Sequence, residues 1–185
     1  ISHQKVWHYR SLKKDNAHIR HTFIRAIVMQ NPFHCVLIGT DVYDNHTKSF
    51  SIGLAPQVEI KGKKTDKGII GSPWNFNQTD DSNLFQDRFG GVRSHFTQIR
   101  YATPAVKIEP AERDTLIDKV IELSKDFYQR KYRYGYVVGW LRWGNYYNCF
   151  SFVKKLISDA FKGEFIFSYS VIGLKRGRVS LSRGT

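Results

Sequence analysis

Cys149 and His34 are the residues of this sequence whose types and positions best fit nucleophilic catalysis. The segment Asn148-Cys-Phe-Ser-Phe-Val153 opens an apolar stripe of helical spacing, which predicts a helix with Cys149 in its first turn and Asn148 as its N-cap. Free backbone N–H groups and the helix dipole favour a thiolate at that position, so we expect a lowered pKa. The alternative interpretation is that Cys149 is a small buried hydrophobic residue within the stripe.

A nucleophilic thiol needs a base, and His34 opens an apolar strand that extends to Gly39. The pair supplies the nucleophile and base of thiol acyl transfer, with the Cys149 N–H as an oxyanion donor. His21 competes with His34, because it also opens a strand-like segment. Alternate strand residues face opposite sides, so if His34 points at the helix of Cys149, Cys35 points away from it. Cys35 is therefore predicted to be a bystander, and a Cys35–Cys149 disulfide is disfavoured.

The elements that must position these residues are strands in the first half of the chain and two helices in the second half. Turn residues at 44–47 separate two apolar segments and predict a β-hairpin with arms near 34–42 and 48–54. Further strands are expected near 22–29, 94–101 and 165–174. Helical spacing predicts one helix near 111–131 and a second from Cys149 to Gly163.

The chain of 185 residues is expected to form a single catalytic domain over 1–185. Three parts differ in composition from the rest: a basic N-terminal segment at 1–20, a long loop region at 61–91 and a basic tail at 175–185. Aromatic and glycine residues between 132 and 147 predict an irregular connector. No run of about 18 apolar residues is present, so we expect no transmembrane segment, and residues 1–20 do not resemble a signal peptide.

The charge balance suggests a kind of partner. Formal net charge is +13, which favours anionic partners such as nucleic acid, acidic cell-wall polymer, anionic lipid or an acidic protein. Cations and aromatics interleave between residues 131 and 155, as in proteins that bind single-stranded nucleic acid. Such aromatics more often line a core or groove, so nucleic acid is not the favoured partner. Two cysteines are too few for a disulfide scaffold and lack zinc-site spacing, and nothing indicates a metal or organic cofactor.

The order of these motifs resembles the circularly permuted papain-like NlpC/P60 superfamily, which includes lecithin-retinol-acyltransferase-like and YiiX-like cysteine hydrolases and bacterial secreted effectors. The similarity covers roughly residues 20–160 and rests on His34, the segment Ser49-Phe-Ser-Ile-Gly-Leu-Ala-Pro56 and Asn148-Cys-Phe-Ser-Phe-Val153. It implies an α+β fold of the papain-like type, with an antiparallel sheet packed against helices and a catalytic cysteine at a helix N-terminus.

The resemblance makes Cys149 the nucleophile and His34 the base, and it implies a third, orienting residue. His46 lies at a spacing from His34 that is found in the acyltransferase branch, so it is preferred over Ser51 and Gln57, which lie on or after the next strand. The implied activity is hydrolysis of an amide bond, with peptidoglycan peptide as the favoured anionic polymeric substrate.

The same resemblance implies a secreted or delivered toxin that acts outside the cytoplasm of the producing cell, and an immunity protein is a candidate partner. Two alternatives remain open. One is a thiol acyltransferase or ester hydrolase of the same fold. The other is a non-enzymatic basic module that binds nucleic acid or an acidic partner, in which Cys149 belongs to the core.

Overall fold

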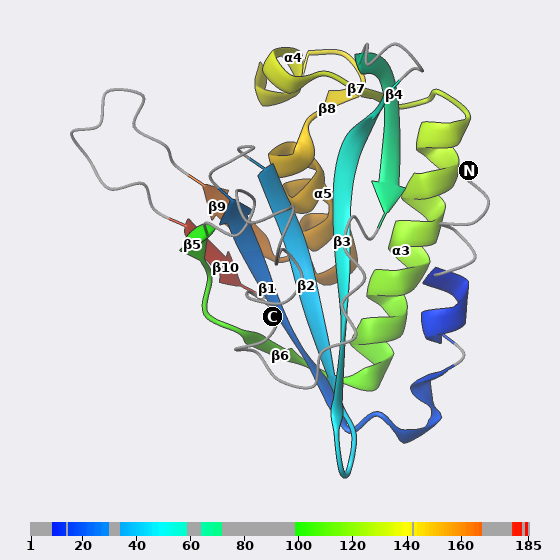
Figure 1. Ribbon diagram of the computed structural model, residues 1–185, viewed down its shortest axis with the longest axis vertical. Coiled ribbons are helices and arrows are strands. Elements are labelled where there is room, and N and C mark those ends of the chain that lie inside the picture. The colour runs from blue at the N-terminus through cyan, green and yellow to red at the C-terminus, as the bar shows by residue number, and fades with distance from the viewer. Residues whose placement is uncertain are drawn as a thin grey trace, which may run out of the picture.

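The computed structural model describes residues 9–13, 15–29, 34–58, 64–71, 99–141, 143–167, 179–182 and 184. Within these residues the chain is an α+β protein with helices packed on an antiparallel sheet (Figure 1). This part of the predicted fold class is confirmed. No described helix is long and apolar enough to cross a membrane.

The main sheet has the strand order β4-β3-β2-β1-β5, and β6 also pairs with β1. All of these pairings are antiparallel. The strands are β1 (His21–Met29), β2 (His34–Val42), β3 (Thr47–Val58), β4 (Lys64–Gly71), β5 (Ile99–Ala102) and β6 (Val106–Ile108).

The predicted hairpin is confirmed as β2 and β3. Their register runs from Val42 opposite Thr47 to Leu37 opposite Ile52, and the Tyr43 N–H donates to the His46 carbonyl in the turn at 2.9 Å. The second arm is longer than predicted, because β3 continues to Val58 and pairs there with β4.

Two helices cover one face of this sheet: α3 (Pro110–Tyr128) and α5 (Cys149–Phe161). They pack against each other, α3 against β4 and α5 against β2 and β3. Both helices were predicted, but α3 ends at Tyr128, three residues before the predicted end at 131. The left-handed residue that ends α5 is Lys162, with φ 52°, one position before the glycine expected to end it.

Alternate residues of the strands face these helices and form the main core with them. The strand residues in this core are Ile24, Ala26, Val28, Cys35, Leu37, Phe50, Ile52, Leu54 and Ile70. The intervening residues Ile27, Val36 and Ile38 are also buried, although they do not belong to that core. The middle of the sheet is therefore apolar on both faces.

The connector between α3 and α5 is more regular than predicted. It holds β7 (Arg133–Tyr134), α4 (Tyr136–Leu141) and β8 (Tyr146–Tyr147), and β7 pairs with β8 in parallel. These elements lie at the end of the molecule where α5 begins (Figure 1). The polypeptide between the two helices is thus a small folded cap.

The terminal and loop segments also differ from the sequence-based expectations. Residues 9–13 and η1 (Asp15–His18) are helical, and Tyr9 and Ile19 are buried, so the basic N-terminal segment contributes to the core. The basic tail contains β10 (Val179–Ser182), which pairs with β9 (Glu164–Phe167). The predicted loop region at 61–91 contains β4, and its residues 61–63 and 72–91 lie outside the described residues, as do 94–98 and 168–174 of the predicted strands.

A buried ion pair fixes α3 to the hairpin end of the sheet. Arg113 donates from Nε to Asp41 Oδ1 at 2.7 Å and from Nη2 to Asp41 Oδ2 at 2.8 Å. The Thr22 hydroxyl donates to the same carboxylate, and Arg113 Nη1 donates to the Leu12 carbonyl. Both charged groups thus have several hydrogen-bond partners, which buried charges require.

Candidate active site

The N-terminus of α5 is held by a reciprocal cap. Asn148 Oδ1 accepts from the Ser151 N–H at 2.8 Å, and Ser151 Oγ accepts from the Asn148 N–H at 2.9 Å. Asn148 Nδ2 also donates to the Tyr136 carbonyl at 3.0 Å, which ties α4 to this helix. The local signals in the sequence thus predicted this turn correctly, and Cys149 is the first residue of α5.

The Cys149 sulfur is buried, since the residue is only 1% exposed. Burial raises the pKa of the thiol to about 11, although hydrogen bonds from the backbone N–H groups of Cys35, Cys149 and Phe150 act in the opposite direction. The thiol is therefore protonated at neutral pH, and the expected lowering of its pKa is wrong. The helix N-terminus can be recognised in the sequence, whereas the burial that dominates the thiol pKa cannot.

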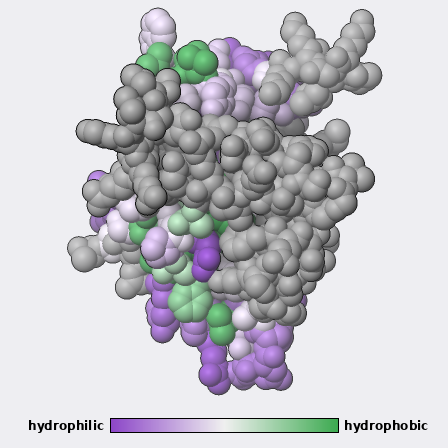
Figure 2. All heavy atoms as spheres, turned by 60° about the vertical axis from the view of Figure 1, so that its left-hand side comes forward, coloured by the Kyte–Doolittle hydropathy of each residue, from purple (hydrophilic) through white to green (hydrophobic). Residues whose placement is uncertain are grey.

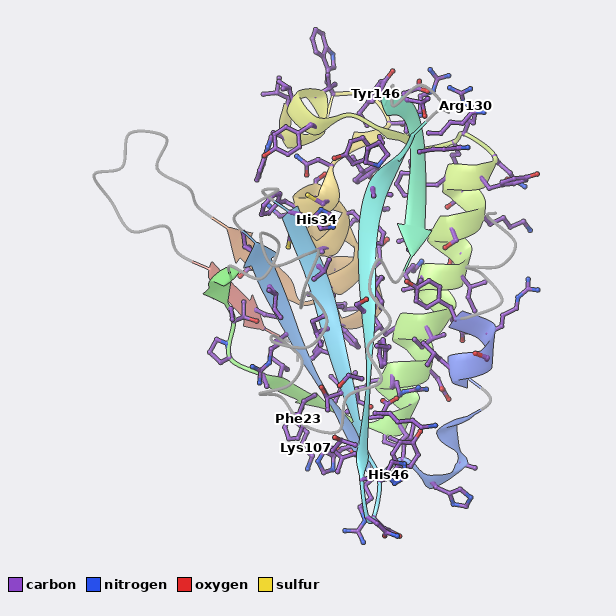
Figure 3. All side chains as sticks on the ribbon, in the orientation of Figure 1. Phe23, His34, His46, Lys107, Arg130 and Tyr146 are labelled. Carbon is purple, nitrogen blue, oxygen red and sulfur yellow. The ribbon has the colours of Figure 1, made fainter. Side chains whose placement is uncertain are left out.

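His34 lies at the end of the sheet that α5 approaches with its N-terminus (Figure 3). It is the first residue of β2 and pairs with Met29 of β1. A Cβ added at Gly53 would lie 3.5 Å from His34 Nε2 and 2.9 Å from Val36 Cγ1, so the imidazole extends over β3. Burial lowers the His34 pKa to about 4, which keeps the ring neutral at physiological pH.

The two faces of β2 are assigned opposite to the sequence-based expectation. Cys35 is fully buried and belongs to the same core as Cys149, and its backbone N–H donates toward the Cys149 sulfur. Cys35 therefore faces α5, and the alternation of the strand directs His34 and Val36 to the other face. His34 is therefore the strand neighbour of Cys35, which contacts Cys149, but the His34 ring lies on the opposite side of the sheet. Cys35 is no longer a distant bystander.

The structure does not bring His46 to this site. His46 is exposed in the turn after Val42, and its ring stacks on Tyr43 at 4.5 Å. The nine residues of β2 separate this turn from His34 by roughly 27 Å, so His46 cannot orient the His34 imidazole (Figure 3). Ser51 and Gln57, the other candidates, lie on β3 between Thr47 and Val58, and Ser51 is buried.

His21, the competitor of His34, also lies at the far end of the sheet. It pairs with Val42, and its ring makes an edge contact with Phe23. Of the two strand-opening histidines, only His34 is at the same end as Cys149, whose sulfur lies beside the backbone of the next residue, Cys35. The position of His21 removes it as a partner of Cys149, whereas the role of His34 as the base stays a prediction.

Sequence reasoning did not single out Tyr134, which the structure places near the thiol. Tyr134 is half-buried in β7 and pairs with Tyr147, the residue before the cap of α5. Burial raises the pKa of its phenol, and the proximity of Cys149 and Tyr136 raises it further. Its hydroxyl is therefore protonated and able to donate a hydrogen bond. No signal in the sequence could place it there, since the pairing joins two-residue strands.

Aromatic side chains surround the start of α5. Tyr147 and Tyr132 meet edge to face at 5.2 Å, and the Trp140 ring stacks on Phe150 at 4.8 Å. Among the described residues, no group of three histidine, cysteine, aspartate or glutamate side chains is arranged to hold a metal ion. The reactive side chains described at this end of the molecule include the Cys149 thiol, the His34 imidazole and the Tyr134 phenol.

The chain was compared with known proteins by family, by sequence and by structure. It matches no protein-family model, no curated protein and no solved structure.

Proposed function

We propose that this protein is a cysteine hydrolase with a papain-like fold of the permuted NlpC/P60 type, in which Cys149 attacks the carbonyl carbon of an amide. The observation that carries the proposal is the position of Cys149 at the first residue of α5, where the backbone N–H groups of Cys35, Cys149 and Phe150 converge on its sulfur. These donors stabilise negative charge as it develops during acyl transfer.

The proposed reaction starts from an uncharged pair. The thiol pKa of about 11 and the imidazole pKa of about 4 leave Cys149 protonated and His34 neutral at rest. In the first step the sulfur–carbon bond forms while the thiol proton moves to His34. The carbon–nitrogen bond then breaks, and the leaving amine takes that proton. Water hydrolyses the resulting thioester with His34 again as the base, which restores the thiol.

The His34 side chain has to move for this reaction. Its ring lies over Gly53 on the face of β2 opposite to Cys35, whereas the Cys149 sulfur lies beside the Cys35 N–H. Because the Cα–Cβ bond of His34 points to that face, side-chain rotation alone does not bring the ring to the sulfur. The proposal therefore requires a change of backbone conformation at the start of β2. Tyr134, beside the thiol, is a candidate hydrogen-bond donor to the carbonyl oxygen.

The proposed substrate is an amide bond in bacterial peptidoglycan peptide, and the proposed setting is a secreted effector that acts outside the cytoplasm of the producing cell. The formal net charge of +13 supports attraction to an anionic polymer, and the sequence resemblance supports the reaction class. The two alternative activities, ester hydrolysis and acyl transfer to another acceptor, use the same thiol chemistry. They are distinguished from amide hydrolysis by the product that forms.

A second candidate is a basic binding module without catalytic activity. The observation that favours it is the burial of Cys149, which packs in the main core with Phe152 and Val153. In that case the thiol is a core side chain.

The test is digestion of purified peptidoglycan, followed by mass spectrometry of new amines and peptides. The wild-type chain is expected to release them, and Cys149→Ala to release at least about 10⁴-fold less, since a nucleophile is lost. Cys35→Ala is the matched control, because it removes a thiol from the same core and leaves the proposed nucleophile in place. Release that is unchanged in folded Cys149→Ala would exclude the mechanism. Absence of release by the wild-type chain from wall, ester and acyl-acceptor substrates would favour the binding module.

A further inference from the structure

The short helix α4 directs apolar side chains outward. Val137 is 68% exposed and Leu141 is 70% exposed, and the two lie one turn apart on the same side of the helix. Trp143, two residues after α4, is 74% exposed. We call these three residues the α4 surface. Figure 2 shows hydrophobic side chains at the end of the molecule that carries α4.

This orientation is fixed by contacts on the opposite side of α4. Gly139 packs so closely on Asn148 that a Cβ there would meet its backbone, and the Trp140 ring stacks on Phe150 at 4.8 Å. The Trp143 N–H donates to the Val138 carbonyl at 3.3 Å. The helix therefore cannot turn its apolar side inward without losing its contacts with α5.

The sequence around the α4 surface is rich in cations. Between Asp126 and Asp159 it contains no acidic residue and six cations, which are Arg130, Lys131, Arg133, Arg142, Lys154 and Lys155. Two of them pair with the acidic residues at the ends of this segment, Lys131 with Asp126 at 4.0 Å and Lys155 with Asp159 at 3.1 Å. The Arg133 N–H donates to the Asn145 carbonyl at 2.9 Å, which places the basic turn at 130–133 beside the loop that carries Trp143. Arg130 and Arg133 both contact Asp66 and share this single carboxylate.

We propose that the α4 surface docks onto an anionic lipid bilayer. Exposed Val and Leu side chains gain little from a phosphodiester or a polysaccharide, whereas they gain from transfer to the acyl region. Trp side chains favour the bilayer interface, and neighbouring cations favour anionic headgroups. The partner is thus a membrane surface, and binding there directs the start of α5 toward the lipid. This inference goes beyond hydrolysis and does not depend on it.

The test is flotation with vesicles of phosphatidylcholine, with and without phosphatidylglycerol. We expect the chain to float with the vesicles that contain phosphatidylglycerol, and less at high salt. Val137→Ser combined with Leu141→Ser should weaken binding by at least about 10-fold, because the inserted side chains are lost. Cys149→Ala should bind like the wild type, which separates this inference from the catalytic proposal.

A matched pair of variants tests the contribution of positive charge to vesicle binding. Lys131→Gln removes an exposed cation near the α4 surface and should weaken binding to anionic vesicles, whereas Lys48→Gln removes one from the hairpin at the other end of the sheet and should not. Absence of flotation with either vesicle, or equal flotation of the double serine variant in its folded state, would overturn the proposal. The proposal would also be overturned if the chain did not bind vesicles but bound peptidoglycan or self-associated, and if the double serine variant abolished that interaction.

Discussion

The two ends of β2 bury polar groups in different ways. At the hairpin end, Asp41 receives two hydrogen bonds from Arg113 and one from Thr22, so its charge is compensated by partners. At the other end, burial shifts the pKa of His34 to about 4 and that of Cys149 to about 11, so both groups are buried as neutral species.

This difference separates a structural use of polar groups from a chemical one. A buried ion pair whose hydrogen bonds are all formed has a fixed geometry, and its groups are not available to transfer a proton. The imidazole and the thiol at the other end are buried without charge, and burial shifts both pKa values in the directions that oppose proton transfer from Cys149 to His34. The proposed activity is assigned to this end because both of its proposed groups lie there.

The largest expected effect concerns the two histidines at opposite ends of the sheet. His34→Ala should lower turnover by about 10² to 10⁴-fold, since it removes the proposed base. His21→Ala should leave turnover unchanged, because His21 pairs with Val42 at the far end. Initial rates of peptide release measure both. If folded His34→Ala retains full turnover, His34 is a structural residue and the base lies elsewhere.

The second prediction concerns stability at the hairpin end. Arg113→Met leaves the buried Asp41 carboxylate without its guanidinium partner and should lower the free energy of unfolding by about 3 to 5 kcal/mol. The double variant Asp41→Leu with Arg113→Met should recover much of that loss, because no buried charge remains. Urea denaturation measures both. A single variant as stable as the wild type would show that this pair does not hold α3 on the sheet.

The local features of the fold could be predicted from the sequence. Asn148 followed by a helical apolar stripe predicted the start of α5, and the turn residues before Thr47 predicted the hairpin. Each of these signals lies within a few residues of the feature it indicates. The pairing of β7 with β8 joins segments of two residues, so neither had a recognisable pattern.

The errors at the candidate site come from contacts between distant segments. The alternation along β2 was predicted, but the face that meets α5 was not, because Val36 and Leu37 are both buried. A strand that is apolar on both faces does not indicate which side a helix covers. The burial of Cys149 likewise depends on Cys35 and the cap elements, and it reversed the direction of the thiol pKa shift.

The third prediction compares the thiol in the folded and unfolded chain. With a pKa of about 11, Cys149 holds about 10² to 10³-fold less thiolate at neutral pH than an ordinary cysteine. Iodoacetamide should therefore label Cys149 slowly in the native chain and rapidly in the denatured chain. The measurement uses the Cys35→Ala variant, in which Cys149 is the remaining cysteine. Rapid labelling of native Cys149 near pH 6 would mean that the sulfur is accessible and ionised.

The smallest expected effect is the dependence of stability on pH. The His34 pKa is about 4 in the folded chain and about 6.5 when unfolded, so between these values the unfolded chain binds more protons. Stability should therefore rise with pH from about 4 to 6.5, and fall as the pH drops through that window, by an amount on the order of 2 kcal/mol. His34→Asn should remove this slope, whereas His46→Asn, at the exposed hairpin turn, should leave it unchanged. Unfolding free energies measured from pH 4 to 7 test this, and an unchanged slope in His34→Asn would show that His34 is not buried in its neutral form.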